Sequence, residues 1–488
     1  MNPTAPTASD SLVYPPGFRA RRGLNWGFLG LLYTSFYMCR YNLSIANTAI
    51  SKEFGFSRAD MGTIITVALL AYAFGQIING LLTDRIGGKR AMLIGAGGTI
   101  TMNILFGAAS YCGVLHPELN NVDHPAGQWM VGFNLFHTEI FFRLLMLFVA
   151  IRGLDGYMQA YGAPGMIKIN TAWFSHRERG RFAGIFGFMI NLGRFGIFNL
   201  GPALLAGFVF LGMWHVPPLH WRWLFWIPSG ICAVVAVGMA LTVKQTPEEA
   251  GFHGTSAAEA AGTGPEARFK EVLLAIVSNP TVWIVALAYA CTGAVRQAID
   301  NWFPRYMQEM FQMDLKSAQF QWLGFLIPFV ASAGSLTSGY VSDIVFKGRR
   351  APVAAGLYFL ETAFILAAAQ FHSANAAVAF LVLISLTANS THSILGTAAA
   401  MDIGGRKNAG FASGIIDSFQ YFGGSLAGIV LGRLLDKSLG NYFYFMAPFG
   451  VIGGLLMLFM QWRLNVKARQ VAASGVGRSG NGETAGKH

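Results

Sequence analysis

Charged residues are scarce in this sequence. Asp, Glu, Lys and Arg make up 12% of its 488 residues, whereas 53% are hydrophobic. Soluble proteins carry about 25% charged residues, so this composition excludes a soluble enzyme and indicates an integral membrane protein. The apolar stretches run unbroken for about 20 residues, the length of one helical span. They lack the short alternating segments that are typical of a transmembrane β-barrel.

Cysteine is also rare, and the expected signals for catalysis are missing. The four cysteines show no paired spacing, which predicts neither a disulfide framework nor a metal site. Ser, Cys and His show no nucleophile spacing, and there is no glycine-rich loop that would cradle a phosphate. We therefore expect neither an enzyme nor a bound cofactor. The first 23 residues contain no apolar core followed by a small-residue cleavage site, so no removable signal peptide is expected.

Hydropathy predicts an all-α membrane protein with twelve transmembrane helices. The net charge of +12 does not indicate nucleic acid, because most of the 35 Lys and Arg fall in segments that are cytoplasmic if the N-terminus is cytoplasmic. This bias predicts a multi-pass protein with both termini in the cytoplasm. The predicted spans are 24–48, 60–83, 91–112, 138–167, 180–210, 222–243, 278–306, 318–343, 351–371, 376–401, 409–435 and 441–462.

A polar segment divides the predicted spans into two sets of six. Residues 244–277 contain the stretch GTSAAEAAGTGPEA, whose small, polar and acidic composition is typical of a flexible linker. We expect this segment to be cytoplasmic. The other predicted parts are a cytoplasmic N-terminal tail, a six-helix bundle on each side of the linker, and a cytoplasmic C-terminal tail, at 1–23, 24–243, 278–462 and 463–488.

The two halves repeat each other. Asp84 lies in the segment Gly-Leu-Leu-Thr-Asp-Arg-Ile-Gly-Gly-Lys-Arg after the second span, and Asp343 lies in a similar basic segment after the eighth, 259 residues later. Arg40 in the first span and Arg296 in the seventh are 256 residues apart, and a tyrosine precedes each by seven residues. Parallel repeats of this kind predict two pseudo-symmetric six-helix bundles with a transport site between them near mid-membrane.

The segment at Asp84 resembles the signature of the major facilitator superfamily, and its second copy makes the match specific. Ordinary positive-inside loops would explain the Lys and Arg, but not Gly and Asp at matched spacing twice. The resemblance implies the major facilitator fold. We expect these residues to act in gating and not in substrate binding: Asp84, Arg85, Lys89, Arg90 and Asp343.

Polar side chains recur at helical spacing within several predicted spans. Because a charge at mid-bilayer costs at least about 3 kcal/mol, such residues face a partner or an aqueous cavity. The first span carries Tyr33, Tyr37, Arg40 and Ser44 on one face, and the seventh carries Tyr289, Thr292, Arg296 and Asp300. Other spans carry Arg152, Asp155 and Gln159; Asn191 and Arg194; Asn389 and His392; and Asp417, Gln420 and Tyr421.

Arg40 and Arg296 predict an oxyanion site between the bundles. Guanidinium is planar, always charged and bidentate toward oxyanions, so one arginine from each half can clamp a phosphate. The alternative for each arginine is an internal ion pair. We prefer that alternative for Arg152 with Asp155 but not for Arg296 with Asp300, and Arg40 has no acidic residue within helical reach.

A more specific resemblance is to the organophosphate:phosphate antiporters, which include bacterial glycerol-3-phosphate and hexose-phosphate transporters. It covers nearly the whole chain and rests on segments around Arg40, Gln159, Glu178, Pro247 and Arg296. The resemblance implies that Arg40 and Arg296 bind phosphate, that Tyr33 and Tyr37 line the cavity, and that the protein lies in the inner membrane. The complete set predicted to bind substrate is Arg40, Arg296, Tyr33, Tyr37, Gln159, Tyr289, Arg152, Asn389 and His392.

The chain departs from the glycerol-3-phosphate pattern in its charges. Gln76 and Ile190 stand where that transporter has a lysine and a histidine, and Arg152 and Arg194 are additions. The extra arginines either suit a substrate with a second anionic group or pair with Asp155 and Asp417. Since Arg40 and Arg296 already balance a phosphate dianion, a lysine at position 76 is expected to add an unbalanced charge and to slow return of the empty carrier.

Three functions follow from these patterns. The first is a secondary transporter, expected to be a monomer, that exchanges an organic phosphate for inorganic phosphate by alternating access. The second is a proton-coupled symporter of an organic carboxylate, with Asp155, Asp417 or His392 as the titrating group. The third is a transporter-like sensor of a sugar phosphate. In each case the partners are small anions and the lipid bilayer, and no nucleic acid is expected.

Overall fold

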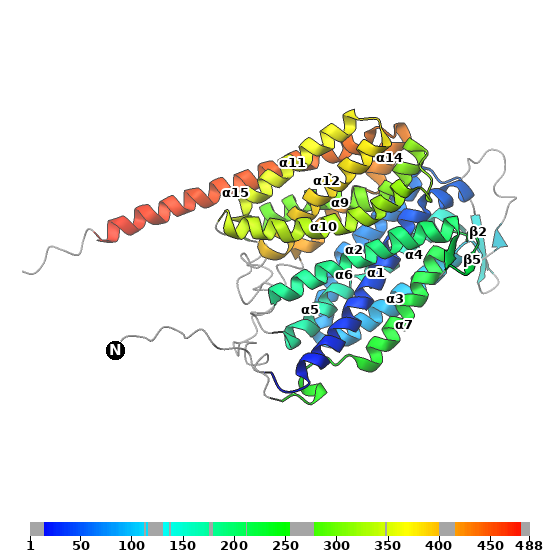
Figure 1. Cartoon of the computed structure of the whole chain (residues 1–488), viewed down its shortest axis with the longest axis horizontal. Helices are drawn as coiled ribbons and strands as arrows, with labels where there is room; N and C mark the ends of the chain where they lie inside the picture. The colour runs from blue at the N-terminus through cyan, green and yellow to red at the C-terminus, as the bar shows by residue number, and fades with distance from the viewer. Residues whose placement is uncertain are drawn as a thin grey trace, which may run out of the picture.

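The computed structural model describes residues 14–111, 114–115, 130–135, 138–174, 179–210, 212–253, 278–346, 349–399 and 415–479. These residues form long helices joined by short connections (Figure 1). Only short strands accompany the helices in the described ranges, near one end of the molecule. Predictions for most of loop 113–137, for linker residues 254–277 and for both extreme tails lie outside the described residues.

The first half contains seven helices, which account for the six predicted spans. They are α1 (Phe18–Phe54), α2 (Arg58–Ile86), α3 (Gly88–Ala108), α4 (Leu144–Gln159), α5 (Gly162–Trp173), α6 (Arg179–Ala206) and α7 (Trp223–Thr242). Strands β1 (Val114–Leu115), β2 (Met130–Leu135) and β3 (Thr138–Arg143) form one antiparallel sheet in that order, and β4 (Phe208–Phe210) pairs with β5 (Trp214–Val216). A 3₁₀ turn at Glu248–Ala250 follows α7.

The second half accounts for the other six spans. Its helices are α9 (Pro280–Phe311), α10 (Ala318–Ile344), α11 (Arg350–Gln370), α12 (Ala374–Ser393), α14 (Ile429–Lys437) and α15 (Asn441–Ser479). A π-helical segment, Ile394–Ala399, extends α12, and residues 415–425 form a further helix before α14. The turn at 426–428 divides the eleventh predicted span into two pieces.

Nine helices within the described ranges are long and apolar enough to cross a membrane. The other three predicted spans fall short for visible reasons. Helix α1 carries the polar stripe, α4 has only 16 residues, and the eleventh span is divided. Together these elements make the all-α, twelve-span arrangement that hydropathy predicts.

The fourth predicted span, 138–167, is wrong at its start and in its continuity. Residues Thr138–Arg143 pair with β2 as a strand, and the helix begins only at Leu144. The segment Thr-Glu-Ile-Phe-Phe-Arg is rich in aromatic and β-branched residues, which favour a strand over a helix. A turn at Ala160 and Tyr161 then separates α4 from α5, where Pro164 lies in the first turn and is tolerated.

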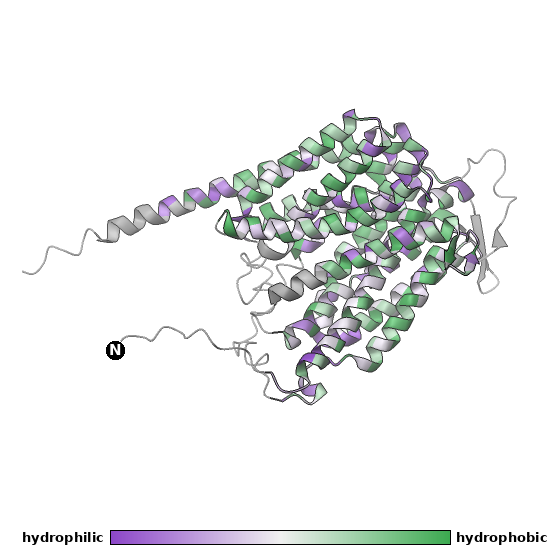
Figure 2. Ribbon diagram, viewed as in Figure 1, coloured by the Kyte–Doolittle hydropathy of each residue, from purple (hydrophilic) through white to green (hydrophobic). Residues whose placement is uncertain are grey.

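The helices of each half pack mainly with one another. In Figure 1, α1 to α7 lie on one side of the molecule and α9 to α15 lie on the other. Helix α1 packs against α6 and α7, and α9 packs against α12 and α15. Figure 2 shows that hydrophobic residues cover much of the outer helical surface. Val234, Val237 and Leu241 of α7 are among the exposed apolar side chains there, as expected for helices facing lipid.

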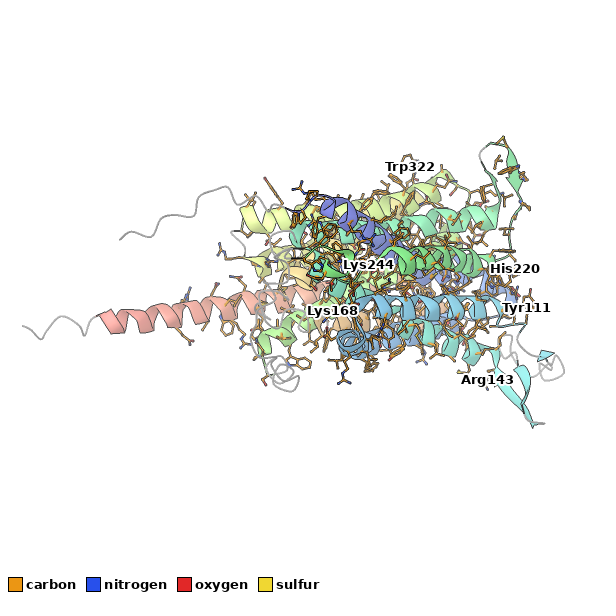
Figure 3. The ribbon with its side chains drawn as sticks, turned by 90° about the horizontal axis from the view of Figure 1, so that it is seen from below. Tyr111, Arg143, Lys168, His220, Lys244 and Trp322 are labelled. Atoms are coloured by element: carbon orange, nitrogen blue, oxygen red, sulfur yellow. The ribbon has the colours of Figure 1, made fainter. Side chains whose placement is uncertain are left out.

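Within the described residues, the halves pack mainly through three helix pairs: α1 with α9, α2 with α14, and α6 with α10. The α2–α14 crossing is close, because a Cβ added to Gly62 would lie 2.4 Å from the carbonyl oxygen of Gly428. Only glycine permits such an approach of two backbones. The predicted topology makes the Gly62 end of α2 exterior. Figure 3 shows Tyr111, Arg143 and His220 at the strand-bearing end of the molecule, and Lys168 and Lys244 farther from it.

Polar contacts also hold the two halves together at the end of the molecule where α2 begins. Both carboxylate oxygens of Asp436 on α14 accept backbone N–H bonds of 2.9 Å from the first residues of α2, Arg58 and Ala59. The Nε of Arg58 lies 2.8 Å from Glu309 Oε2 on α9. The carboxylate of one half therefore caps a helix of the other, where the helix dipole favours negative charge.

We expect Asp436→Asn to loosen this end of the molecule. The amide removes the negative charge at the start of α2, where such a charge stabilises a helix by about 0.3–1 kcal/mol. Spin labels at Lys52→Cys and Lys437→Cys, one on each half, should report a broader and longer distance distribution in the variant. The control Asp314→Asn should leave the distribution unchanged, because that carboxylate bonds the backbone of Lys316 in its own half. Identical distributions in all three proteins would show that Asp436 does not hold this end closed.

Candidate functional site

The polar faces of α1 and α9 are buried in the interior, as their spacing predicts. The arginines of the two helices, Arg40 and Arg296, are 8% and 4% exposed. Tyr33 and Tyr37 of α1 are also buried, with their rings 5.4 Å apart. Because α1 and α9 pack against each other from opposite halves, both arginines come from helices at the junction of the halves.

The Arg40 guanidinium is held by neutral groups from both halves. Its Nε donates to Gln159 Oε1 at 2.9 Å, and its Nη1 donates to the Tyr421 hydroxyl at 3.0 Å. The cation lies 4.2 Å from the ring centroid of Tyr72 and 4.5 Å from that of Tyr37. Within the described residues its Nη2 has no hydrogen-bond partner. Arg40 is thus oriented and keeps a donor unused.

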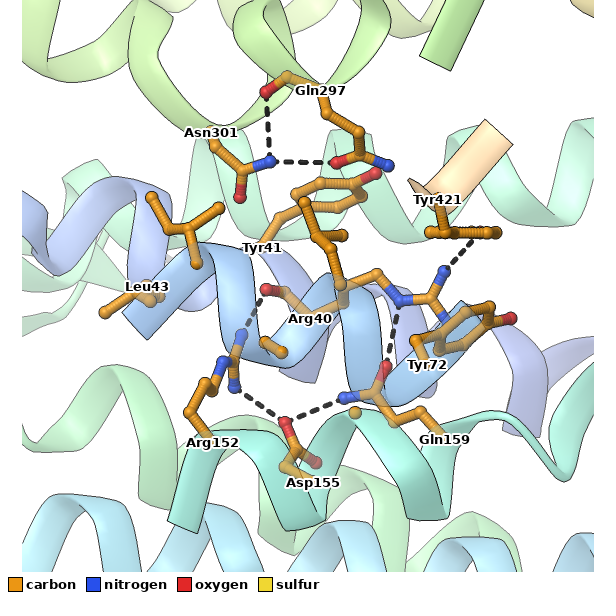
Figure 4. Close-up of a pocket in the computed structure, with 14 residues that line it drawn as sticks. Arg40, Tyr41, Leu43, Tyr72, Arg152, Asp155, Gln159, Gln297, Asn301 and Tyr421 are labelled. Carbon is orange, nitrogen blue, oxygen red and sulfur yellow. Dashed lines mark hydrogen bonds and ion pairs between the residues drawn. The ribbon is translucent and has the colours of Figure 1, made fainter. Parts of the chain in front are cut away.

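Arg152 and Asp155 form the ion pair that their spacing on α4 suggests. Arg152 Nη1 lies 2.7 Å from Asp155 Oδ2, and both side chains are buried. Arg152 also donates to the backbone carbonyls of Cys39 and Arg40. Gln159 donates to Asp155 at 3.0 Å while accepting from Arg40, so these residues form one connected chain (Figure 4). Arg152 therefore supports the backbone that carries Arg40.

A small cavity lies beside this chain. Arg40, Arg152 and Gln159 line it, as do two residues of α9 from the other half, Gln297 and Asn301 (Figure 4). Asn301 donates to Gln297 Oε1 at 2.8 Å. Sequence reasoning did not place Gln297, Tyr72 or Tyr421 in the site. Gln297 and Asn301 are at i, i+4 spacing on one face of α9, which could have suggested that these two residues lie together.

Arg296 is surrounded by predicted site residues of the second half. Its Nη1 lies 3.2 Å from the ring nitrogens of His392, whose Nδ1 lies 2.5 Å from the Tyr289 hydroxyl. The Gln420 amide, turned to suit its neighbours, accepts from Arg296 Nη1 at 2.9 Å. Within the described part of the chain the Nε of Arg296 has no hydrogen-bond partner. Each arginine of the pair thus keeps one unused donor.

Asp300 pairs mainly with Arg194 and not with Arg296. Arg194 of α6 donates to Asp300 of α9, and both side chains are fully buried. Arg296 Nε is 3.9 Å from the other carboxylate oxygen. The alternative that Arg194 pairs with Asp417 is therefore wrong. Helical spacing could not reveal the real partner, because it lies 106 residues away in the other half.

Asp417 instead contacts neutral donors from three helices. Gln76 of α2 donates to its Oδ2 at 2.7 Å, and the Tyr289 hydroxyl donates to its Oδ1 at 3.4 Å. In its adjusted orientation the Gln420 nitrogen also donates to Oδ1, at 3.2 Å. The contact with Gln76 crosses between the halves and joins residues 341 positions apart. Sequence reasoning identified both residues but not their contact.

Asn389 stands apart from the arginines in its hydrogen bonding. Its amide donates to the carbonyl and the hydroxyl of Ser385 on the same helix, at 2.8 and 3.3 Å. These local bonds are typical of a helix-packing residue. The structure therefore supports no contact of Asn389 with the predicted anion site.

The residues predicted to act in gating lie away from the cavity. Asp84 pairs with Lys168 of α5 at 2.8 Å, and Lys89 donates to the carbonyl of Ala240 at 2.8 Å. Arg85 and Arg90 are exposed. The side chain of Asp343 lies outside the described residues. This placement agrees with the expectation that these residues do not bind substrate, and their role in gating stays a prediction.

Comparisons with known proteins agree with this architecture. The glycerol-3-phosphate transporter of Bacillus subtilis is 26% identical over 463 residues, which cover 91% of this chain and 93% of that protein. The membrane sensor protein UhpC of Salmonella typhimurium is 25% identical over 455 residues, covering 89% and 90%. A probable hexose phosphate transport protein of Chlamydia trachomatis is 24% identical over 455 residues, covering 89% and 88%.

A solved structure shares the fold. It is a bacterial homologue of the human lysosomal transporter Spinster in an inward-facing, unoccupied conformation, with a TM-score of 0.62 and 14% identity over 90% of this chain and 95% of that one. The relatives confirm the resemblance to organophosphate transporters and agree with the expectation that this multi-pass membrane protein is not an enzyme. The model of the Major Facilitator Superfamily matches residues 29–428, and the chain therefore belongs to that superfamily.

Proposed function

We propose that this protein exchanges an organic phosphate ester for inorganic phosphate across the cell inner membrane, by alternating access and with both termini in the cytoplasm. The relatives that transport glycerol 3-phosphate or are named for hexose phosphate support the substrate class. The exchange partner, the conformational cycle and the orientation are our inference from the site.

One observation carries the proposal. Arg40 and Arg296, at equivalent positions of the two halves, are both buried, and each keeps one guanidinium nitrogen without a hydrogen-bond partner within the described residues. An unsatisfied buried donor on a charged group costs about 1–3 kcal/mol or more. A tetrahedral oxyanion would satisfy both donors with charge-assisted hydrogen bonds. The pair therefore suits a phosphate group.

The same pair explains exchange in preference to net transport. Two cations that approach from opposite halves repel each other, and the repulsion is strong where little water screens it. A bound phosphate removes that repulsion, so the loaded carrier changes conformation more readily than the empty one. We assign Tyr33, Tyr37, Tyr289 and His392 to the walls of this site, and Gln159 to the orientation of Arg40.

The second candidate function is sensing, and it is favoured by the similarity to UhpC over most of the chain. The assay is the same for both functions. Purified protein is reconstituted in vesicles loaded with labelled phosphate, and glycerol 3-phosphate, hexose phosphates, phosphoglycerates and phosphoenolpyruvate are offered outside. Release of label that depends on an outside phosphate supports exchange. Binding of a phosphate ester without any release would support sensing and overturn the proposed exchange.

We expect Arg40→Lys and Arg296→Lys each to lower phosphate exchange at least about a hundredfold while the protein still folds. Lysine keeps the charge but loses the planar fork that binds two oxygens. Initial exchange rates and size-exclusion profiles measure the two effects. Arg222→Lys is a matched control, because Arg222 is also buried but pairs with Glu53 outside the site. A wild-type rate in either site variant would remove that arginine from phosphate binding.

Arg152 and Asp155 are expected to act as a structural pair. Removing one partner of a buried ion pair costs about 3–5 kcal/mol, whereas removing both is milder. Arg152→Gln and Asp155→Asn should therefore each lower the unfolding temperature more than the double variant does. If Arg152→Gln keeps full stability but changes which phosphate ester competes best, Arg152 contacts substrate and the pairing role is wrong.

A further inference from the structure

The charges of the proposed anion site do not match a doubly charged phosphate. Two arginines are neutralised by ion pairs, Arg152 with Asp155 and Arg194 with Asp300. Three charged groups of the described site remain, namely Arg40, Arg296 and Asp417. With Asp417 ionised, two positive charges and one negative charge leave a net charge of +1. This site would match a singly charged anion, whereas the proposed substrates carry up to two charges near neutral pH.

Asp417 differs from the other two carboxylates in its surroundings. Asp155 and Asp300 are 2% and 0% exposed and each contacts an arginine. Asp417 is partly exposed. Its described hydrogen bonds come from three neutral side chains, those of Gln76, Tyr289 and Gln420. No Lys or Arg nitrogen of the described residues lies within salt-bridge distance of it. The charge of this carboxyl group is therefore not balanced by any described ion pair.

Among the charged and titratable groups of the site, Asp417 is the one best able to change its charge near pH 7. Six charged or titratable side chains face Asp417 from α1, α2, α9 and its own helix: Arg40, Tyr33, Tyr72, Arg296, Tyr289 and Tyr421. Arginines stay charged and tyrosines stay neutral near pH 7. His392 of α12 shares the Tyr289 hydroxyl, but its ring lies 3.2 Å from the Arg296 guanidinium, where a second positive charge is disfavoured.

We propose that Asp417 is a proton-binding site that couples a proton to the binding of doubly charged phosphate. One proton from water adds to the carboxylate when the dianion binds, which raises the net charge of the site from +1 to +2. The proton leaves when the dianion leaves, and no bond of the substrate changes. A singly charged anion binds without the proton. This inference rests on the proposed function, because it concerns the same phosphate site.

The contact between Gln76 and Asp417 reverses the expectation for a lysine at position 76. Such a lysine would not add an unbalanced charge, because the Gln76 amide nitrogen lies 2.7 Å from Asp417 Oδ2. An ammonium group there would pair with the carboxylate and keep it ionised. The site would then carry a net charge of +2 without any proton. Gln76→Lys is therefore expected to bind the dianion without proton uptake.

The test measures protons taken up when purified full-length protein binds inorganic phosphate. Calorimetry in two buffers of different ionisation enthalpy gives this number for wild type and for Asp417→Asn. Sulfate, a tetrahedral anion that stays doubly charged between about pH 5 and pH 8, is measured in parallel, so that any proton taken up with it belongs to the protein. At about pH 8 we expect wild type to take up about one proton more than Asp417→Asn. The dissociation constant of wild type divided by that of Asp417→Asn should be near one at about pH 5. Above that pH this ratio should rise by up to about tenfold per pH unit.

Two further variants make the result decisive. Gln76→Lys should match the proton count of Asp417→Asn, and it replaces that variant if Asp417→Asn does not fold. Glu361→Gln should match wild type, because Glu361 is a fully buried carboxyl on α11 whose oxygens contact none of the described residues of the proposed anion site. Binding with equal proton uptake in wild type, Asp417→Asn and Gln76→Lys would overturn the proton site alone. Failure of wild type to bind phosphate would overturn the proposed function and this inference with it.

Discussion

Every charged side chain placed inside the bilayer needs a partner, and this constraint organises the interior of the protein. Arg152 has a local partner, Asp155, one helical turn away. Arg194 has a partner across the molecule, Asp300 of the other half. Arg40 is instead held by neutral groups, namely tyrosine rings, the Tyr421 hydroxyl and Gln159. Within the described residues, these contacts leave one guanidinium nitrogen of Arg40 and one of Arg296 without a hydrogen bond, and the proposed anion site is built on these two nitrogens.

The contacts between the halves have a consequence for movement. The Arg194–Asp300 pair, the Ser44 hydroxyl bond of 2.8 Å to the Asp300 carbonyl and the Asp436 cap on α2 all hold the halves together. A buried ion pair is costly to separate unless water or another charge replaces each partner. Opening the molecule between α6 and α9 therefore requires water to reach Asp300.

Much of the fold and part of the site could be predicted from the sequence, because both depend on local patterns. Hydropathy located the spans, and repeated spacing related Arg40 to Arg296. The i, i+3 spacing suggested the Arg152–Asp155 pair. The Arg194–Asp300 and Gln76–Asp417 contacts were missed because they join distant residues and depend on how each helix is rotated against its neighbour. The strand at Thr138–Arg143 was missed because its apolar residues also fit the start of a span.

Arg40 and Arg296 occupy equivalent positions in the two repeats, but their surroundings differ. On the first half, the carboxylate nearest Arg40 is Asp155, which is fixed by Arg152 and reaches Arg40 only through Gln159. On the second half, Arg296 shares its surroundings with His392, Gln420 and Asp417. Neutral contacts make the Arg40 side a rigid holder of constant charge. The proposed proton site, Asp417, lies among the second-half neighbours of Arg296, where a positive charge on His392 is disfavoured. A symmetric fold thus supports an asymmetric site, because the pseudo-symmetry constrains the helices and not the side chains that neutralise them.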